Sequence, residues 1–327
     1  MRKIVLAGGT GQVGTILARH FHAAGDDVVV LSRTPKAAPW RTVAWDAKTL
    51  GPWTSELEDA DVVINLAGRN VNCRYTPANR REIMSSRVDS TLAIGQAIAW
   101  AKRPPRAWLQ MSTATIYAHR FDAPNDEATG IIGKDEPGAP PAWNFSIDVA
   151  QAWERAVDEA VTPQTRKVKL RSSVVFSPGH GGIFDTLLTL TRRGLGGRAG
   201  NGKQYVSWIH EADFVRAIEW IVARASLTDI VNVASPNPLP NADFMRELRE
   251  ASHTSISLPS PRWLLEIGAV FIRTETELLL KSRRVIPGRL LESGFRFEYP
   301  TWPQAALDLC KRSRRRRNAV YRLCASR

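Results

Sequence analysis

A glycine-rich segment near the start of the chain has the residue types and spacing of a site for dinucleotide phosphates. Gly9, Gly11 and Gly14 fit the pattern G-x-G-x-x-G, directly after the apolar run Ile4 to Leu6. Glycines permit a tight turn, and a helix that begins at such a turn presents free N–H groups to phosphate. We therefore expect a dinucleotide cofactor to be bound by Gly8, Thr10, Gly11, Gln12, Val13 and Gly14.

The residues after the next strand-like runs indicate which dinucleotide is bound. NAD sites usually place an acid after the second strand, whereas this chain has Ser32 and Arg33 there. A guanidinium pairs with a 2′-phosphate, so the sequence favours NADP (NADPH) over NAD; a solvent-facing Arg33 is the alternative. Asp46 is a candidate contact for the adenine amino group or the cap of a turn. Small residues after the fourth strand would let the cofactor approach the backbone: Leu66, Ala67 and Gly68.

Such a site needs a sheet that brings several strand ends together. Strand-like runs alternate with helical stretches in the first half, which is typical of an α/β fold with a doubly wound parallel sheet of the Rossmann type. We expect the nucleotide-binding domain to cover residues 1–176, with residues 205–235 returning to it in part. The predicted strands are Lys3–Ala7, Asp27–Ser32, Thr42–Trp45, Val62–Ala67, Ala107–Thr113, Lys167–Phe176 and Ile230–Ala234.

Residues 177–310 are expected to form a smaller C-terminal α/β domain that closes the substrate crevice. A helix capped by Asn241, a helix at Trp263–Lys281 and a last helix from Thr301 are predicted. The glycine-rich loop at 194–202 resembles a P-loop, but Gln204 replaces the Ser or Thr that would hold magnesium. We interpret it as a flexible lid in which Lys203 and Gln204 are candidate substrate contacts.

Charge and composition narrow the class of protein. The chain has 327 residues and a formal net charge of +13, and the segment 311–327 holds eight Lys and Arg residues without an acid. We interpret this basic tail as a solvated, disordered end and expect a small-molecule substrate, with no specific nucleic-acid partner and no membrane. Cys73, Cys310 and Cys324 lie far apart, so no metal site is expected. The first residues leave no room for a signal peptide, which favours a cytoplasmic protein.

Several sequence blocks resemble the epimerase/dehydratase-like branch of the extended short-chain dehydrogenases/reductases. They are GGTGQVG, LSR, INLAG, SRVDST, SWIHEADFVRAI, VNVASPNP and LLLKSRRVIPGRLLESGFRFEYP, and together they cover nearly the whole chain. The resemblance implies an NADP-dependent oxidoreductase or epimerase-like enzyme for a carbonyl or alcohol, with nucleotide sugars among its substrates. It also implies a small C-terminal domain over the crevice, and a role for Arg87 in ordering the site or binding an anionic substrate.

The chain departs from the resemblance at the catalytic pair. Family members use Tyr-x-x-x-Lys for proton exchange, whereas the corresponding segment here has Phe145 and Val149. The Ser/Thr element survives as Thr113, with Ser112 the alternative. Candidate proton donors are Tyr117, His119, Tyr205 and His210, although His210 with Asp213 is also suited to start a helix. The lost pair makes a non-catalytic NADP(H)-binding regulatory or sensor protein the alternative function.

Overall fold

Seven parallel strands form one sheet in the order β10-β6-β5-β4-β1-β2-β3. The computed structural model describes residues 1–140, 142–255 and 277–325. The strand order reverses between β1 and β4, and in such sheets the crevice beyond the strand ends at this point binds the ligand. The predicted Rossmann-type fold is therefore confirmed. The strands are β1 (Lys3–Ala7), β2 (Asp27–Ser32), β3 (Arg41–Ala44), β4 (Val62–Asn65), β5 (Ala107–Thr113), β6 (Arg166–Ser172) and β10 (Asp229–Val233).

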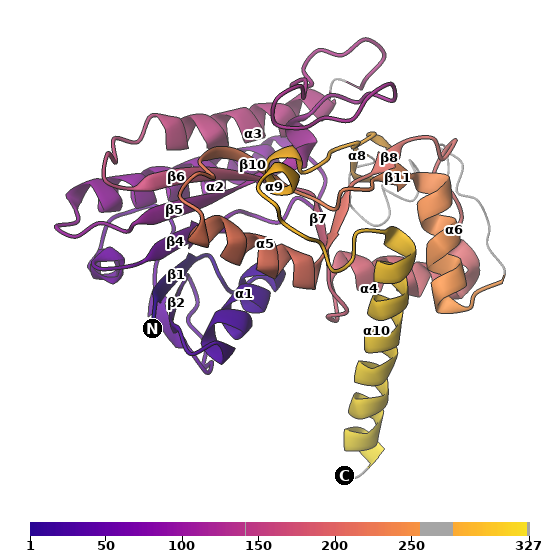
Figure 1. Ribbon diagram of the computed structural model, residues 1–327, viewed down its shortest axis with the longest axis horizontal. Coiled ribbons are helices and arrows are strands. Elements are labelled where there is room, and N and C mark those ends of the chain that lie inside the picture. Colours follow the sequence, from indigo (N-terminus) through magenta and orange to yellow (C-terminus); the bar gives the residue numbers. More distant parts are fainter. Residues whose placement is uncertain (141, 256–276, 326–327) are drawn as a thin grey trace.

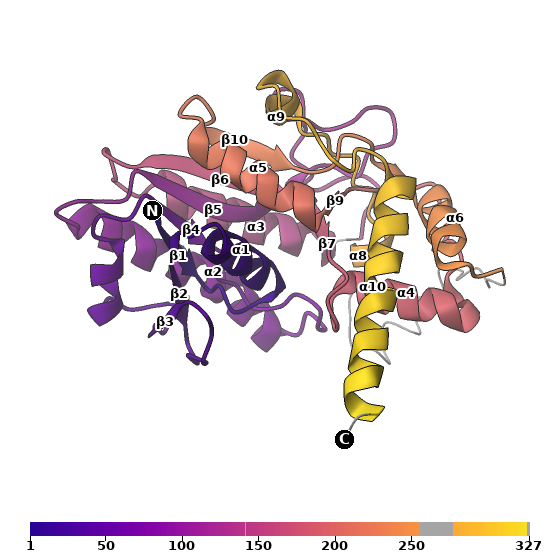
Figure 2. The ribbon, with the colours of Figure 1, turned by 60° about the horizontal axis from the view of Figure 1, so that its bottom comes forward.

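Helices cover both faces of the sheet, α1 and α5 on one and α2 and α3 on the other (Figures 1 and 2). Alternate residues of a strand point to opposite faces, so Ile4 and Leu6 enter one apolar core while Val5 and Ala7 enter the other. Burial on both faces explains why β1 is a continuous apolar run. The helices and short 3-10 turns of this half are α1 (Gln12–Ala23), η1 (Pro52–Leu57), α2 (Pro77–Trp100), η2 (Ala114–Ile116), α3 (Ala142–Asp158) and α5 (Glu211–Ala223).

The prediction of a single strand at Lys167–Phe176 is wrong. The segment divides into β6 and β7 (Val174–Phe176), and β7 pairs with β9 (Trp208–His210) in a separate two-stranded sheet. Ser173 lies at the break, where its backbone N–H and hydroxyl both donate to Val233 O, at 3.0 and 3.1 Å. The break lets the chain leave the main sheet and enter the C-terminal region.

The C-terminal region packs around an aromatic core in which Trp302 stacks on Phe244 with ring centroids 4.1 Å apart. Asn241 does not cap its helix as predicted: it is the first helical residue, after the N-cap Pro240, and its Oδ1 accepts from Ala199 N at 2.7 Å. Most of the helix predicted at Trp263–Lys281 lies outside the described residues. The elements here are α4 (Ile183–Leu190), η3 (Thr191–Leu195), β8 (Tyr205–Val206), β11 (Leu239–Pro240), α6 (Asn241–Ser252), α8 (Glu277–Leu280), α9 (Gly288–Glu292) and α10 (Trp302–Ala325).

The expectation of a disordered basic tail is wrong, because α10 continues through the arginine run to Ala325. Its first turns are anchored by buried Trp302, Ala306 and Leu309. No Gly or Pro follows Pro303 in the helix, and arginine is a good helix former, so nothing local ends it. Figure 1 shows that the second half of α10 extends beyond the rest of the molecule. Among the described residues, no helix has the length and apolar character needed to span a membrane.

Candidate functional site

The turn between β1 and α1 requires glycine at two positions. Gly8 has a φ of +73°, and a Cβ there would lie 2.7 Å from the Cα of Ala67. A Cβ on Gly14 would lie 2.4 Å from the Cα of Gly9. Such distances are too short for any side chain. The turn therefore holds the start of α1 close to the ends of β1 and β4, at the switch point of the sheet.

The N-terminus of α1 opens onto free space. Apart from Gly11 and its two chain neighbours, no heavy atom of the described residues lies within 4 Å of the position that a Cβ on Gly11 would take. Gly11 is the N-cap, no side chain caps the helix, and its first turn has no acid. The first N–H groups are therefore available to an anion and carry the partial positive charge of the helix end. A dinucleotide diphosphate fits this cradle, beside the exposed side chains of Thr10 and Gln12; Val13 packs toward the core and offers only its N–H.

Arg33 is exposed just beyond the end of β2. In the part of the chain that the structure describes, no carboxylate lies within ion-pair distance of its guanidinium. Ser32 is only 4% exposed, and its hydroxyl accepts from Thr34 N at 3.2 Å. Arg33 is thus available to a phosphate, whereas Ser32 mainly fixes the turn that carries it.

Asp46 forms the cap of a turn after β3. Its carboxylate accepts from the backbone N–H groups of Lys48 and Thr49, at 2.9 and 2.8 Å, and from the Thr49 hydroxyl at 2.5 Å. These hydrogen bonds lower the pKa of Asp46, and the bond from the Thr49 hydroxyl has the largest effect. The structure thus supports the turn-cap interpretation, and the adenine contact stays a prediction.

Leu66, Ala67 and Gly68 continue from β4 along the side of the glycine turn. Leu66 N donates to Ala7 O at 2.8 Å, and Ala67 N donates to the side chain of buried Asn65 at 3.0 Å. These bonds fix the backbone of this segment against Gly8. The segment therefore lies at the switch point of the sheet, as a second wall of the proposed cofactor crevice.

Arg87 is half-buried and lies against Gly68. A Cβ on Gly68 would lie 3.0 Å from the Arg87 Cζ, and this Cζ is 5.0 Å from the centre of the Trp153 ring. Burial lowers the pKa of Arg87 to about 10. Its Nη1 donates to Ile83 O at 3.0 Å, and among the described residues no carboxylate is paired with it. Such a desolvated guanidinium is well suited to an anionic group.

The three predicted catalytic hydroxyls have different surroundings. Ser112 is buried and donates to Glu154 at 2.6 Å. Tyr117 is 2% exposed, donates to Asn232 at 2.9 Å, and has a pKa raised by burial. Thr113 is half-buried, and its hydroxyl oxygen accepts from Thr115 N at 3.1 Å. Ser112 and Tyr117 are thus engaged in structural hydrogen bonds, and the hydrogen of Thr113 remains available for a substrate oxygen.

Phe145, predicted from the sequence to stand where the family has its catalytic tyrosine, is engaged in aromatic packing. The Phe145 ring meets Tyr75 edge-on at 5.1 Å between centroids, and the Arg80 guanidinium lies 4.9 Å from the centre of the Phe145 ring. Ser146 donates to Glu277 at 2.6 Å, which ties this segment to the C-terminal region. The segment therefore has a packing role in this chain.

Sequence reasoning missed two cations that contact Thr115, in the turn after Thr113. Lys281 is 1% exposed and its Nζ donates to Thr115 O at 2.9 Å, while Arg283 donates to the Thr115 hydroxyl at 3.1 Å. Burial lowers the pKa of Lys281 to about 8. The signal was present, because cations stand among apolar residues in the block LLLKSRRVIPGRL. Through these bonds the C-terminal region fixes the turn that follows Thr113.

The two histidines among the candidate donors are both engaged. His210 is fully buried, caps α5 by accepting from Ala212 N at 3.1 Å, and lies 3.1 Å from Asp308. Its structure supports the helix-start role. The Nδ1 of His119 accepts from Ser282 N at 2.5 Å, and burial, then the charges of Lys281 and Arg283, lower its pKa.

The other candidate contacts lie in or next to the glycine-rich loop. Lys203 is exposed, and Gln204 is buried, with its Nε2 donating to Ala199 O at 2.9 Å. Gln204 O accepts from Asn241 N at 2.8 Å, which places the loop against the start of α6. Tyr205 is half-buried under the Arg284 guanidinium, 4.6 Å from its ring centre. Contact of these residues with a substrate stays a prediction.

Comparisons with known proteins agree with this fold. A sequence model of the NAD dependent epimerase/dehydratase family matches residues 4–234, and a domain of unknown function, DUF1731, matches residues 260–309. The epimerase family protein SDR39U1 of Bos taurus is 34% identical over 302 residues, which are 91% of this chain and 96% of that protein.

Solved structures give the same result for the fold. Human SDR39U1 (isoform 2), crystallised with NADPH, has a TM-score of 0.81 and 29% identity, covering 95% of this chain and 99% of that one. UDP-N-acetylglucosamine 4-epimerase from Bacillus cereus has a TM-score of 0.74 at 15% identity, covering 96% of this chain and 100% of that one. At that identity the second similarity concerns the fold alone.

Proposed function

The chain belongs to the NAD-dependent epimerase/dehydratase family, and we propose that it is an NADPH-dependent oxidoreductase or epimerase-like enzyme. We infer that it acts on a carbonyl or alcohol group of a small molecule, with nucleotide sugars among the candidates. The observation that carries the choice of cofactor is Arg33 after β2, where an NAD site would have an acid; this arginine is exposed and forms no ion pair with the described residues. That human SDR39U1 was crystallised with NADPH supports this choice.

Each part of the site has a distinct task in this proposal. The open N-terminus of α1 binds the diphosphate, and Arg33 binds the 2′-phosphate. When bound, NADPH would supply the hydride that reduces a carbonyl carbon, and water would supply the proton that the carbonyl oxygen takes up. The Thr113 hydroxyl donates a hydrogen bond to the substrate oxygen and so holds it in place. Lys281 and Arg283 act indirectly, by fixing the Thr115 turn through the bonds described above.

Arg87 points to an anionic substrate. A partly desolvated cation without a carboxylate partner in the described part of the chain is stabilised when an anion binds beside it. It lies against Gly68, next to the end of β4, and so close to the proposed cofactor crevice. We therefore propose that the substrate carries a phosphate or carboxylate group that pairs with Arg87.

The cofactor assignment is tested by titrating wild type and Arg33→Ala with NADPH and with NADH. The wild type should prefer NADPH, and the variant should bind NADPH about tenfold or more weakly, because one charge-assisted contact is lost. Its affinity for NADH should not change. Lys102→Ala is the matched control, because it removes an exposed cation that precedes β5, at the amino ends of the parallel strands, whereas Arg33 follows the carboxyl end of β2. Equal affinities for both nucleotides in the wild type would contradict the assignment.

A second function, an NADP(H)-binding regulatory or sensor protein, is favoured by Phe145 and Val149 in place of the catalytic pair. NADPH oxidation with a panel of anionic carbonyl compounds separates the two functions. An enzyme should turn over at least one compound, and Thr113→Val should lower that rate while leaving NADPH affinity unchanged. A sensor should bind NADPH with no turnover across the panel.

A further inference from the structure

One cavity joins the glycine turn to the basic C-terminal helix. It has a volume of about 840 Å³ and is lined by Gly11, Gln12 and Arg19 on one side and by Arg312, Arg315 and Arg316 of α10 on the other. The loop that follows β7 forms a third wall. In both ribbon views this loop lies between α1 and α10 (Figures 1 and 2).

The loop after β7 contacts both sides of this cavity. A Cβ on Gly182 would lie 2.8 Å from Oε1 of Gln12, on the glycine turn. A Cβ on Gly179 would lie 3.7 Å from Nη1 of Arg316, on α10. This loop therefore lies between the arginine-bearing face of α10 and the open N-terminus of α1.

The cavity is strongly positive. Arg312, Arg315 and Arg316 share one face of α10 because they are spaced i, i+3 and i+4. Arg312 forms ion pairs with Glu211 and, at 3.3 Å, with Asp308. Arg315, Arg316 and Arg19 are exposed, and in the described ranges none of the three has a carboxylate within ion-pair distance. Glu211, already paired, is the one acid among the residues that line the cavity.

We propose that Arg315 and Arg316 bind the diphosphate of the nicotinamide cofactor, so that the C-terminal helix forms part of the cofactor site. This inference rests on the proposed function. The free N–H groups of α1 and these two guanidinium groups would then face the same anion from different walls of one cavity. Both arginines follow residue 309, where the matched C-terminal domain ends, so the contact is an addition to the part of the chain that the family models match.

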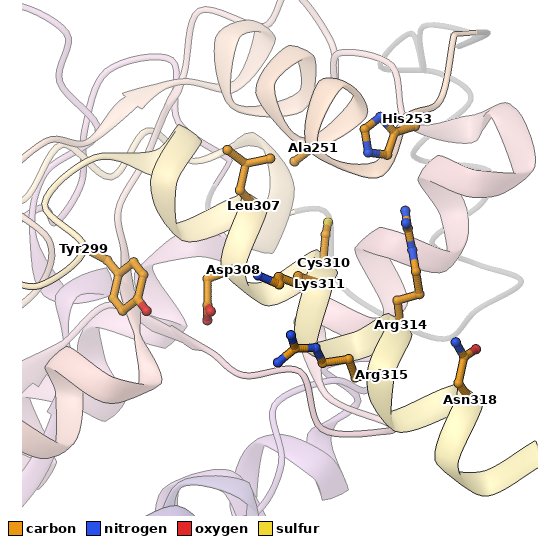
Figure 3. Close-up of a pocket in the computed structure, with 10 residues that line it drawn as sticks. All are labelled: Ala251, His253, Tyr299, Leu307, Asp308, Cys310, Lys311, Arg314, Arg315 and Asn318. Carbon is orange, nitrogen blue, oxygen red and sulfur yellow. The ribbon is translucent and has the colours of Figure 1, made fainter. Parts of the chain in front are cut away.

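The test compares two charge-matched double variants of the full-length protein. Arg315→Ala/Arg316→Ala removes two positive charges from the face of α10 that lines the cavity. Arg314→Ala/Arg317→Ala removes two positive charges from other positions on α10. Figure 3 shows Arg314 pointing toward His253 and Arg315 pointing away from it. Arg317 lies near η3, where burial and then the charge of Arg317 lower the pKa of Arg192. Binding of NADPH and of NADH is measured by calorimetry at low and moderate salt.

The cavity variant should bind both nucleotides about tenfold more weakly, by a similar factor, because the diphosphate is common to both. Its affinity should also depend less on salt than that of the wild type, and the control variant should bind like the wild type. If both double variants lost the same affinity for the nucleotides, the loss would come from the change in net charge, and the proposal would be overturned. A loss for NADPH alone would overturn it by pointing to the 2′-phosphate. Unchanged binding in both variants would overturn the inference alone, whereas absent binding in the wild type would overturn the proposed function.

Discussion

Glu154 and Arg171 form a buried ion pair behind the end of β5. Each side chain is 8% exposed, and two parallel bonds join them, at 2.9 Å from Nε and 2.8 Å from Nη2. Ser112 donates to the same carboxylate. The pair therefore fixes the strand end that presents Thr113.

Arg171→Met should lower the free energy of unfolding by about 3–5 kcal/mol, because it leaves a buried carboxylate without its partner. The double variant Arg171→Met/Glu154→Leu should recover most of that loss, since both charges are then gone. Urea unfolding of the two variants and the wild type measures the difference. A single variant as stable as the wild type would show that the pair does not hold this strand end.

Lys281 should make stability depend on pH in alkaline solution. Burial lowers its pKa from 10.5 to about 8, so between these values the unfolded chain binds more protons than the folded protein. The contribution of Lys281 to the free energy of unfolding is therefore lowest below about pH 8 and rises toward about pH 10. Relative to Lys281→Met, the wild type should gain up to about 3 kcal/mol across this window. Urea unfolding of both proteins at several pH values measures the gain, and parallel pH curves would contradict the assignment.

The hydrogen-bond partners of the candidate site residues could not be predicted from the sequence. The prediction of a strand at Ala107–Thr113 is confirmed, because a strand of this kind depends on neighbouring residues. Ser112 and Tyr117 were chosen from the motif around Thr113, yet their partners Glu154 and Asn232 lie 42 and 115 residues away in the chain. Long-range hydrogen bonds of this kind leave no local pattern in the sequence.

At the scale of elements, two glycines at the start of α1 are needed for different reasons. Gly14 is required by steric contacts within the fold, and Gly11 would be required by a bound ligand. Gly14 cannot carry a Cβ because Gly9 lies 2.4 Å from its place, whereas Gly11 has open space and an ordinary φ of −73°. The first glycine thus holds the helix against the strand, and the second keeps the helix end open.

Gly14→Ala should therefore destabilise the fold by several kcal/mol, since the backbone of the turn must move. Gly11→Ala should keep a melting temperature close to that of the wild type but weaken NADPH binding about tenfold or more, because its methyl group enters the phosphate space. Thermal unfolding and calorimetry on both variants make the comparison. Unchanged NADPH affinity in a folded Gly11→Ala would place the diphosphate elsewhere.

Elements set by local pattern were predicted well, and those set by distant contacts were not. The bounds of β1, β2 and β5 follow from apolar runs that are buried on both faces of the sheet. The break between β6 and β7 depends on Val233, 60 residues after Ser173. The arginine run was taken for a disordered end from its charge, whereas buried Trp302 and Leu309 start a helix that then continues.

On the scale of the whole molecule, the sheet brings the glycine turn and the end of β4 together at its switch point, and α10 of the C-terminal region borders a cavity beside this turn. The alternation of strands and helices made the doubly wound fold predictable from the sequence. That α10 borders the glycine turn was not predictable, because some 300 residues separate the two and only the tertiary fold brings them to one cavity. Three arginines of this basic helix, Arg312, Arg315 and Arg316, therefore line that cavity.

The most direct test of the NADPH site is a calorimetric titration of the wild-type protein with NADPH, with NADH in a parallel titration. The open helix end, Arg33 and the positive cavity predict saturable binding of one NADPH per chain in the micromolar range, and weaker binding of NADH. No NADPH binding at millimolar concentration would contradict a working cofactor site and leave the fold as the single feature shared with the family.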